Sequence, residues 1–233
     1  RKVNEAKEIL IKNDIPPIEY IPDLNESISR SRIEGVILQS KQILDILRLA
    51  EISRKLFQFL KPKDSASSVL SELSAKLFVD KVFEHHIGKV FLENGEIRDD
   101  ASIKLKDIRI EIREKESALQ KQVQKILKQL SDSYLVQEEY ITQRDGRIVL
   151  PVKSEHKRHV KGFVHSESSS GQTVYIEPEE TLELNNEILS LGFAEKREIE
   201  KILKGLTERI GQFCSELKNS LSAIAEIDSI FAR

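Results

Sequence analysis

Two long amphipathic stripes, separated by a short β-prone insert, constrain the fold of this chain most. Apolar residues recur at spacings near three and four from Leu105 to Leu130, and the pattern resumes from Leu184 to Phe231. This spacing is typical of one apolar face of an α-helix. The first helix would be roughly 30 residues and about 45 Å long, and the second about 75 Å. Because neither stripe suits burial on all sides, we expect an antiparallel two-helix stalk with Lys106 and Asn219 near the same end.

The insert, from about Glu138 to Glu177, predicts a small antiparallel sheet. Its first half reads "YITQ", then Asp145-Gly146, then "RIVLPVK", which is typical of strand, tight turn and strand. Its second half places "VKGFVHSE" and "QTVYIE" around a turn of three serines and a glycine at 168–171. Pro151 has no N–H to donate to a ladder, so its strand should lie at a sheet edge there.

The first hundred residues predict a small helical core. Helical spacing or capping signals occur over 1–13, Asp23–Arg32, Lys41–Leu60 and Ser67–Ile87, and Asn94-Gly95 predicts a small hairpin. The expected fold class is mainly α: a helical core and a long antiparallel two-helix lever stalk that carries a small four-stranded antiparallel β clamp at its tip. The expected divisions are 1–99 for the core, 100–135 for the outgoing lever helix, 136–178 for the β clamp and 179–233 for the returning lever helix.

Composition indicates the kind of fold and the cellular compartment but does not identify a binding partner. Charged residues make up 33% of the chain, tryptophan is absent and the net charge is −2, a mixture that suits long helices. A single cysteine, Cys214, excludes an internal disulfide and favours a reducing, cytoplasmic setting. No apolar run reaches the ~20 residues of a membrane helix. Because the chain begins without Met and opens and closes inside helical patterns, we expect an interior fragment of a longer protein.

Catalytic motifs are weak throughout. His156 and His159 could lie near one another, but neither cysteines nor a carboxylate pattern complete a metal site, so we expect no metal. Ser168, Ser169 and Ser170 lack the surroundings of a nucleophile elbow and fit a hydroxyl-rich turn better. No G-x-x-x-x-G-K-[ST] loop occurs, so we expect no catalytic residues, no ATP binding and no cofactor in this segment.

The charge distribution gives the strongest functional signal. Six basic residues against two acids lie between Arg144 and Lys161, whereas Ser166–Glu187 holds six acids and no base. Basic loops are usually only solvated, but at the end of a stalk and beside a serine-rich turn this one fits contact with a phosphate backbone. The alternative is contact with an acidic protein surface. The candidate nucleic-acid contacts are Arg144, Arg147, Lys153, Lys157, Arg158, Lys161, Ser168, Ser169, Ser170 and Thr173.

A run of motifs in fixed order resembles a known family. The chain carries "GEIRDDAS" at 95–102, "RDGRIVLPVKSEHK" at 144–157, "GFVHSESSSGQTVYIEP" at 162–178, "LNNEI" at 184–188 and "IDSIFAR" at 227–233. Together they resemble the MutS-two family, the bacterial paralogues of the mismatch-repair protein MutS. The resemblance covers nearly the whole chain and is strongest from Gly95 onward.

The resemblance implies a function for a longer protein, of which this segment would perform only a part. Family members are expected to hold a helical core, lever helices and a clamp, followed by a dimeric ABC-type ATPase that binds ATP and Mg²⁺ and by a C-terminal nuclease module. They are associated with suppressing recombination on branched DNA, or with rescuing collided ribosomes. This chain would be the core, levers and clamp. Its expected partners are branched or duplex DNA, the ribosome, and a second copy held through the ATPase domain. A purely mechanical arm whose tip meets protein is the remaining alternative.

Overall fold

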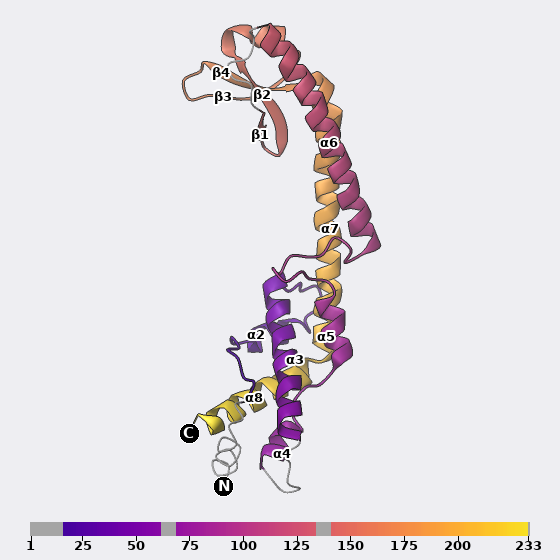
Figure 1. Cartoon of the computed structure of the whole chain (residues 1–233), viewed down its shortest axis with the longest axis vertical. Coiled ribbons are helices and arrows are strands. Elements are labelled where there is room, and N and C mark those ends of the chain that lie inside the picture. The colour runs from indigo at the N-terminus through magenta and orange to yellow at the C-terminus, as the bar shows by residue number, and fades with distance from the viewer. Residues whose placement is uncertain (1–15, 62–68, 134–140, 233) are drawn as a thin grey trace. The chain divides into compact units, whose positions relative to one another are not determined.

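The computed structural model describes residues 16–61, 69–133 and 141–232 in two compact units (Figure 1). The helical unit is Arg1–Ala101 with Ile199–Arg233, and the sheet unit is Ser102–Glu198. Within the described residues the mainly α fold with a small four-stranded antiparallel sheet is confirmed. The helix predicted over 1–13 lies outside the described residues.

Six helices contribute to the described part of the helical unit. They are α2 (Asn25–Arg30), α3 (Ser40–Leu60), α4 (Val69–Ser74), α5 (Lys81–Gly88), the C-terminal part of α7 (Leu182–Gln212) and α8 (Cys214–Phe231). The core of this unit includes fully buried Ile43 and Leu49 of α3 and Phe83 of α5. The expected turn at Asn94-Gly95 is present, closed by an isolated antiparallel bridge between Phe91 and Ile97. Asp23 accepts from the Asn25 backbone N–H at 3.0 Å, although α2 is shorter than predicted.

The uninterrupted helix predicted over 179–233 is divided in the structure. A 3-10 turn, η3 (Glu179–Thr181), comes first, α7 ends at Gln212, and Phe213 leaves the helical conformation with φ −107° before α8 begins. The Phe213 ring packs against Phe78 at 5.4 Å and Phe83 at 5.5 Å between centroids. An aromatic cluster therefore holds the break in place, and a stripe of apolar spacing alone does not reveal it.

The sheet unit begins with α6 (Ile103–Asp132), whose first turn is capped by Ser102. Four strands follow, namely β1 (Thr142–Arg144), β2 (Arg147–Lys153), β3 (Gly162–Glu167) and β4 (Thr173–Pro178). They form an antiparallel sheet of order β1-β2-β4-β3. The predicted Asp145-Gly146 turn is confirmed, with positive φ at both residues. β2 lies inside the sheet, but its pairing with β1 stops at Val149, so among the described strands Pro151 pairs with β4 alone.

One face of the sheet packs on both helices of the unit. Leu150, Val152, Val174 and Ile176 form a cluster with five apolar residues of α6, namely Leu119, Val123, Ile126, Leu127 and Leu130. Leu184 and Ile188 of α7 pack against the same cluster. The sheet therefore rests on the last turns of α6 and the first turns of α7 together.

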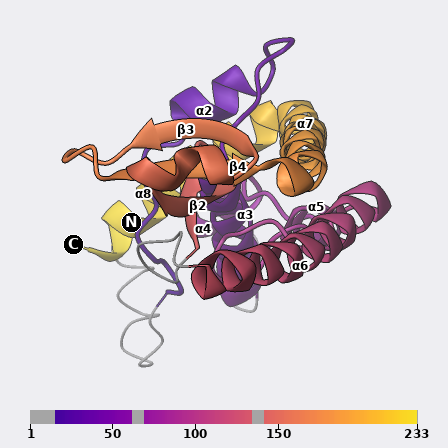
Figure 2. The ribbon, with the colours of Figure 1, turned by 90° about the horizontal axis from the view of Figure 1, so that it is seen from above.

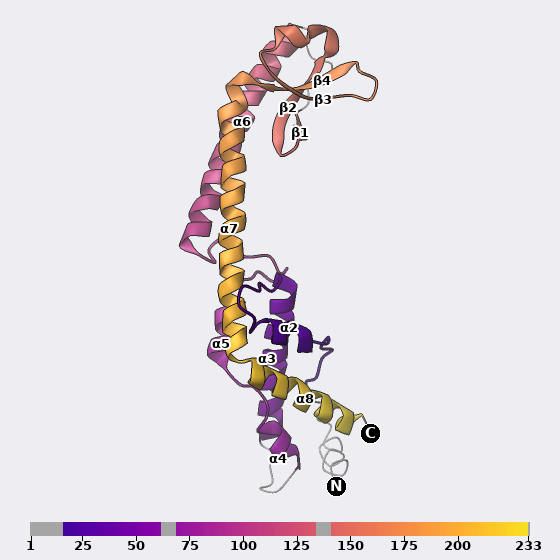
Figure 3. The same ribbon diagram turned by 180° about the vertical axis from the view of Figure 1, so that it is seen from behind.

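Polar contacts join α6 and α7 along the rest of the sheet unit. Ser102 donates to Glu198 at 2.9 Å, Arg109 pairs with Glu195 at 2.7 Å, and Lys115 pairs with Glu187 at 2.7 Å. Because residue numbers rise along α6 as they fall along α7, the two helices are antiparallel, and they lie side by side in Figures 1 and 3. The turn that faces the start of α6 is thus Glu195–Glu198, earlier in the chain than the Asn219 position expected from the sequence.

Candidate nucleic-acid interface

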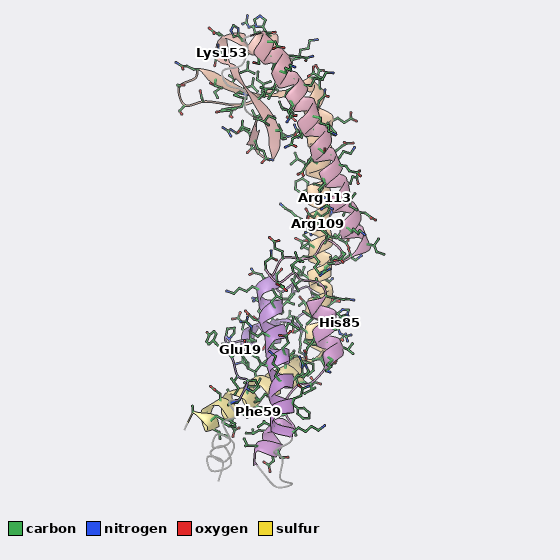
Figure 4. All side chains as sticks on the ribbon, viewed as in Figure 1. Glu19, Phe59, His85, Arg109, Arg113 and Lys153 are labelled. Carbon is green, nitrogen blue, oxygen red and sulfur yellow. The ribbon has the colours of Figure 1, made fainter. Side chains whose placement is uncertain are left out.

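The basic segment between β2 and β3 folds as a short 3-10 helix, η2 (Ser154–His159). Lys157 and Arg158 on this helix are exposed to solvent, as is Lys161 just before β3. Lys153, at the end of β2, is half-buried and is labelled on the sheet in Figure 4. Four of the six predicted basic contacts therefore lie on one short stretch of chain, and three of them are exposed.

The serine-rich turn lies directly beside this basic segment. The Ser154 backbone N–H donates to the Gln172 carbonyl at 3.0 Å, and its hydroxyl donates to the Gly171 carbonyl at 2.5 Å. Lys153, Ser154, Glu155, Gly171 and Gln172 line a shared surface pocket. The structure thus brings together the two loops that the sequence singled out separately.

Hydrogen bonds within the serine-rich turn divide its hydroxyls into two kinds. The Ser168 hydroxyl accepts from the Thr173 backbone N–H at 3.1 Å, and the Ser168 N–H donates to the Thr173 carbonyl at 2.8 Å. Gly171 closes the turn with φ +71°. Ser169 and Ser170 are exposed, whereas Thr173 is buried. Ser168 and Thr173 therefore shape the turn, and Ser169 and Ser170 are the hydroxyls presented to solvent.

Arg144 and Arg147 make contacts within the sheet unit. The Arg144 guanidinium carbon lies 4.1 Å from the centroid of the Tyr175 ring, a cation–π arrangement. Arg147 donates to the Glu177 carboxylate at 2.7 Å and to the Asn186 side-chain oxygen at 2.5 Å. Only 22% of the Arg147 side chain is exposed. The structure thus places Arg147 in an ion pair and leaves Arg144 half-buried on a ring.

A buried polar network around Glu177 was not foreseen from the sequence. The His165 imidazole lies 2.6 Å from one Glu177 oxygen, and Asn185 donates to the other at 2.8 Å. Asn185 also accepts from the Ile148 N–H at 3.1 Å and so ties α7 to β2. One sequence feature could have indicated this network: the acid Glu177 at the end of the apolar stretch "TVYIE". A buried carboxylate there would require partners. The network fixes the sheet on the start of α7.

The two neighbouring histidines of η2 were weighed as metal ligands. The His156 and His159 rings do lie near one another, with centroids 5.8 Å apart. No group of three or more His, Cys, Asp or Glu side chains that could hold a metal occurs among residues 16–61, 69–133 and 141–232. What the arrangement offers is exposed cationic groups and hydroxyls on neighbouring loops.

Comparison with known proteins decides the family. No family model matches the sequence. Proteins named Endonuclease MutS2 from Clostridium beijerinckii and Clostridium perfringens are each 36% identical to the whole chain over 234 residues. The protein of that name from Alkaliphilus oremlandii is 32% identical over 235 residues, again across the whole chain.

The chain belongs to the MutS2 family. It spans 29 to 30% of the length of these MutS2 relatives. The resemblance drawn from the motifs at 95–102, 144–157 and 162–178 is therefore confirmed. Among the helices described for this MutS2 segment, none is both long and apolar enough to cross a bilayer.

Proposed function

We propose that the sheet unit is a nucleic-acid clamp of a MutS2-type protein and that it contacts the phosphate backbone. The observation that supports this most is the exposed cation group of Lys157, Arg158 and Lys161 on a segment hydrogen-bonded to the serine-rich turn. Ammonium and guanidinium groups neutralise phosphates, and exposed hydroxyls such as those of Ser169 and Ser170 donate to phosphate oxygens. Such contacts are independent of sequence.

The proposed target is branched DNA, with suppression of recombination as the cellular role. A second candidate is ribosomal RNA on stalled or collided ribosomes, since exposed cations bind either phosphate backbone. In this proposal the clamp acts within a longer cytoplasmic homodimer. ATP and Mg²⁺ would bind in an ATPase domain outside this segment, and a nuclease module, also outside it, would supply the activity for which the MutS2 relatives are named. The segment itself would bind without catalysing a reaction.

The test measures how binding depends on salt in the full-length dimer. Lys157, Arg158 and Lys161 are replaced together by Ala, and affinity for branched DNA and for ribosomes is measured from low to physiological salt. Each true phosphate contact adds roughly one unit to the log–log slope, so the variant should lose about two to three units and bind all sequences more weakly. A matched control replaces Lys121, Lys125 and Lys128, three exposed lysines of α6, and removes the same charge.

Two outcomes would contradict the proposal. If the folded triple variant keeps wild-type affinity and salt slope on both targets, the basic segment is a solvated surface, and the mechanical arm whose tip contacts protein becomes the better account. If the α6 control flattens the slope equally, the effect reflects net charge and not this surface. A loss confined to ribosomes would select ribosomal RNA over branched DNA.

A further inference from the structure

The strand register shows which side chains share the face of the sheet that lies away from the apolar cluster. Side chains opposite one another in an antiparallel ladder lie on the same face, and successive residues alternate. Val164 pairs with Ile176 of the apolar cluster, whereas Phe163 pairs with Glu177 and Tyr175 pairs with Pro151. Phe163 and Tyr175 therefore lie together on the other face.

The two rings on this face differ in how accessible they are. Phe163 is 61% exposed, an unusual state for a phenylalanine in a strand. It lies on β3, the last strand of the sheet order and the outer strand in Figure 2. Tyr175 is half-buried, and the Arg144 guanidinium covers its ring. The Phe163 ring is thus exposed to solvent, and it shares its face of the sheet with the Tyr175 ring that Arg144 covers.

Cationic groups precede the exposed Phe163 ring along the chain. Lys161 precedes Phe163 by two residues and is exposed, and Lys157 and Arg158 lie on the segment that leads into the same strand. Lys153 pairs with Thr173, four residues along β4 from the Glu177 that pairs with Phe163, so it lies on this face but away from the ring. An isolated exposed apolar residue is ordinary. An exposed ring with an exposed lysine beside it is complementary to an unpaired nucleotide, because a base offers a π-face and its phosphate offers negative charge.

We infer that the outer edge of this face, at β3, binds unpaired nucleotides, with a base stacked on Phe163 and a neighbouring phosphate held by Lys161. The inference rests on the proposed function and adds a contact to it: a stacked base at an unpaired position, which single strands and forks offer and intact duplex does not. Every base has a π-face, so stacking is tolerant of sequence. A base stacked inside an intact duplex cannot reach an exposed side chain, which gives the selectivity for unpaired positions.

Replacing the ring tests the stacking contact separately from the phosphate contacts. In the full-length protein, Phe163→Leu keeps an apolar side chain and removes the π-face, so affinity for a single-stranded oligonucleotide or a forked duplex should fall about 5- to 100-fold. Affinity for blunt duplex and the salt slope should stay unchanged, because stacking releases no counterions. Phe163→Tyr should restore binding. Val164→Ala is the matched control, since Val164 is 50% exposed on the same strand and the opposite face.

Replacing Phe163 with tryptophan would give a direct fluorescence signal of stacking. The chain contains no tryptophan, so Phe163→Trp adds a reporter at this position whose emission is read as the difference from the parent protein. Single-stranded DNA and single-stranded RNA of matched sequence should each quench it, and their relative affinities distinguish the two sources. Blunt duplex DNA at equal occupancy should leave it unchanged. Equal quenching by duplex would overturn the inference.

The failure of this inference is distinguishable from failure of the proposed function. If Phe163→Leu binds single strands like wild type while the cation triple variant is weakened, base stacking is wrong and the phosphate clamp stands. If both variants bind like wild type, the proposed function fails as well. If Phe163→Leu changes the sedimentation of the protein without nucleic acid, the β3 edge is a protein contact and the stacking inference is overturned.

Discussion

The Arg147 guanidinium donates to the Glu177 carboxylate across 2.7 Å, and 2% of the Glu177 side chain reaches solvent. This pair joins the start of β2 to β4, and through Asn185 and Asn186 it reaches α7. The pair thus holds the sheet on the helix. From the sequence alone, Arg147 was grouped with the other basic residues as a candidate phosphate contact.

Removing Arg147 should destabilise the sheet unit. Arg147→Met leaves the buried carboxylate with His165 and Asn185, so we expect a loss of about 1–3 kcal/mol in the free energy of unfolding, measured by denaturant unfolding. Adding Glu177→Gln should recover part of that loss, because the uncompensated charge disappears. Arg144→Met is the control and should cost less, since Arg144 lies on the Tyr175 ring and Arg147 pairs with a buried carboxylate. Strictly additive losses in the double variant would show that the two side chains are not coupled.

Two glycines of α7 should respond to alanine in opposite ways. A Cβ on Gly211 would lie 2.5 Å from the Ser31 carbonyl oxygen, whereas a Cβ on Gly205 meets nothing within 4 Å. Gly211→Ala should therefore destabilise the helical unit by about 1–3 kcal/mol. Gly205→Ala should stabilise α7 by about 0.5–1 kcal/mol, since alanine favours an exposed helix. Thermal unfolding of both variants checks the pair, and a stable Gly211→Ala would mean that the Ser31 backbone does not approach α7 closely.

The helical unit should lose stability in acid partly through His86. Burial lowers the pKa of His86 below 6.5, and Lys89, Arg209 and His85 lower it further. Well above pH 6.5 the side chain is neutral in both states. As the pH falls through 6.5 the unfolded chain takes up the proton first, so stability falls until the folded-state pKa is passed. His86→Gln should flatten this part of a stability–pH profile, whereas His85→Gln, which keeps the burial of His86, should retain it.

Spin labels can measure the antiparallel register of α6 and α7. In a Cys214→Ala background, labels at Lys106 and Lys196 should lie about 10–20 Å apart, since packed helix axes are about 8–10 Å apart. Moving the first label to Lys121 adds about 22 Å of helix rise along the axis, so the distance should lengthen to about 25–30 Å. Double electron–electron resonance measures both label-to-label distances. A shorter distance from Lys121 would rule out the pairing of Arg109 with Glu195.

The regular parts of this fold could be predicted from local sequence. The stripe from Leu105 to Leu130 predicts α6, and Asp145-Gly146 predicts the turn of the first hairpin, because both depend on spacing or on backbone preference within a few residues. The break at Phe213 could not be predicted in this way. It depends on Phe78 and Phe83, which are far away in sequence, and a ring that belongs to an aromatic cluster fits the apolar stripe equally well.

The sequence predicted which basic residues belong to the candidate site, but not which of them are exposed and which make contacts within the sheet unit. The exposed positions of Lys157, Arg158 and Lys161 agree with their polarity, whereas Arg147 has the same charge and lies against Glu177. The partner that separates them is set by strand order, and β2 beside β4 is a tertiary arrangement. Likewise the sequence predicted a strand residue at Phe163, but its exposure follows from β3 being the outer strand.

The shared apolar cluster under the sheet restricts how α6 and α7 can move. Val123 of α6 belongs to this cluster and Ile188 of α7 packs against it, so each helix is attached to the same sheet. Sliding one helix along the other by a turn would pull one set of side chains out of the cluster. Away from it, ion pairs such as Lys115 with Glu187 join the helices, and Leu105 and Ile108 of α6 are buried as well. The sheet therefore fixes the register of the two helices at this end, because neither helix can slide along the other without breaking the cluster.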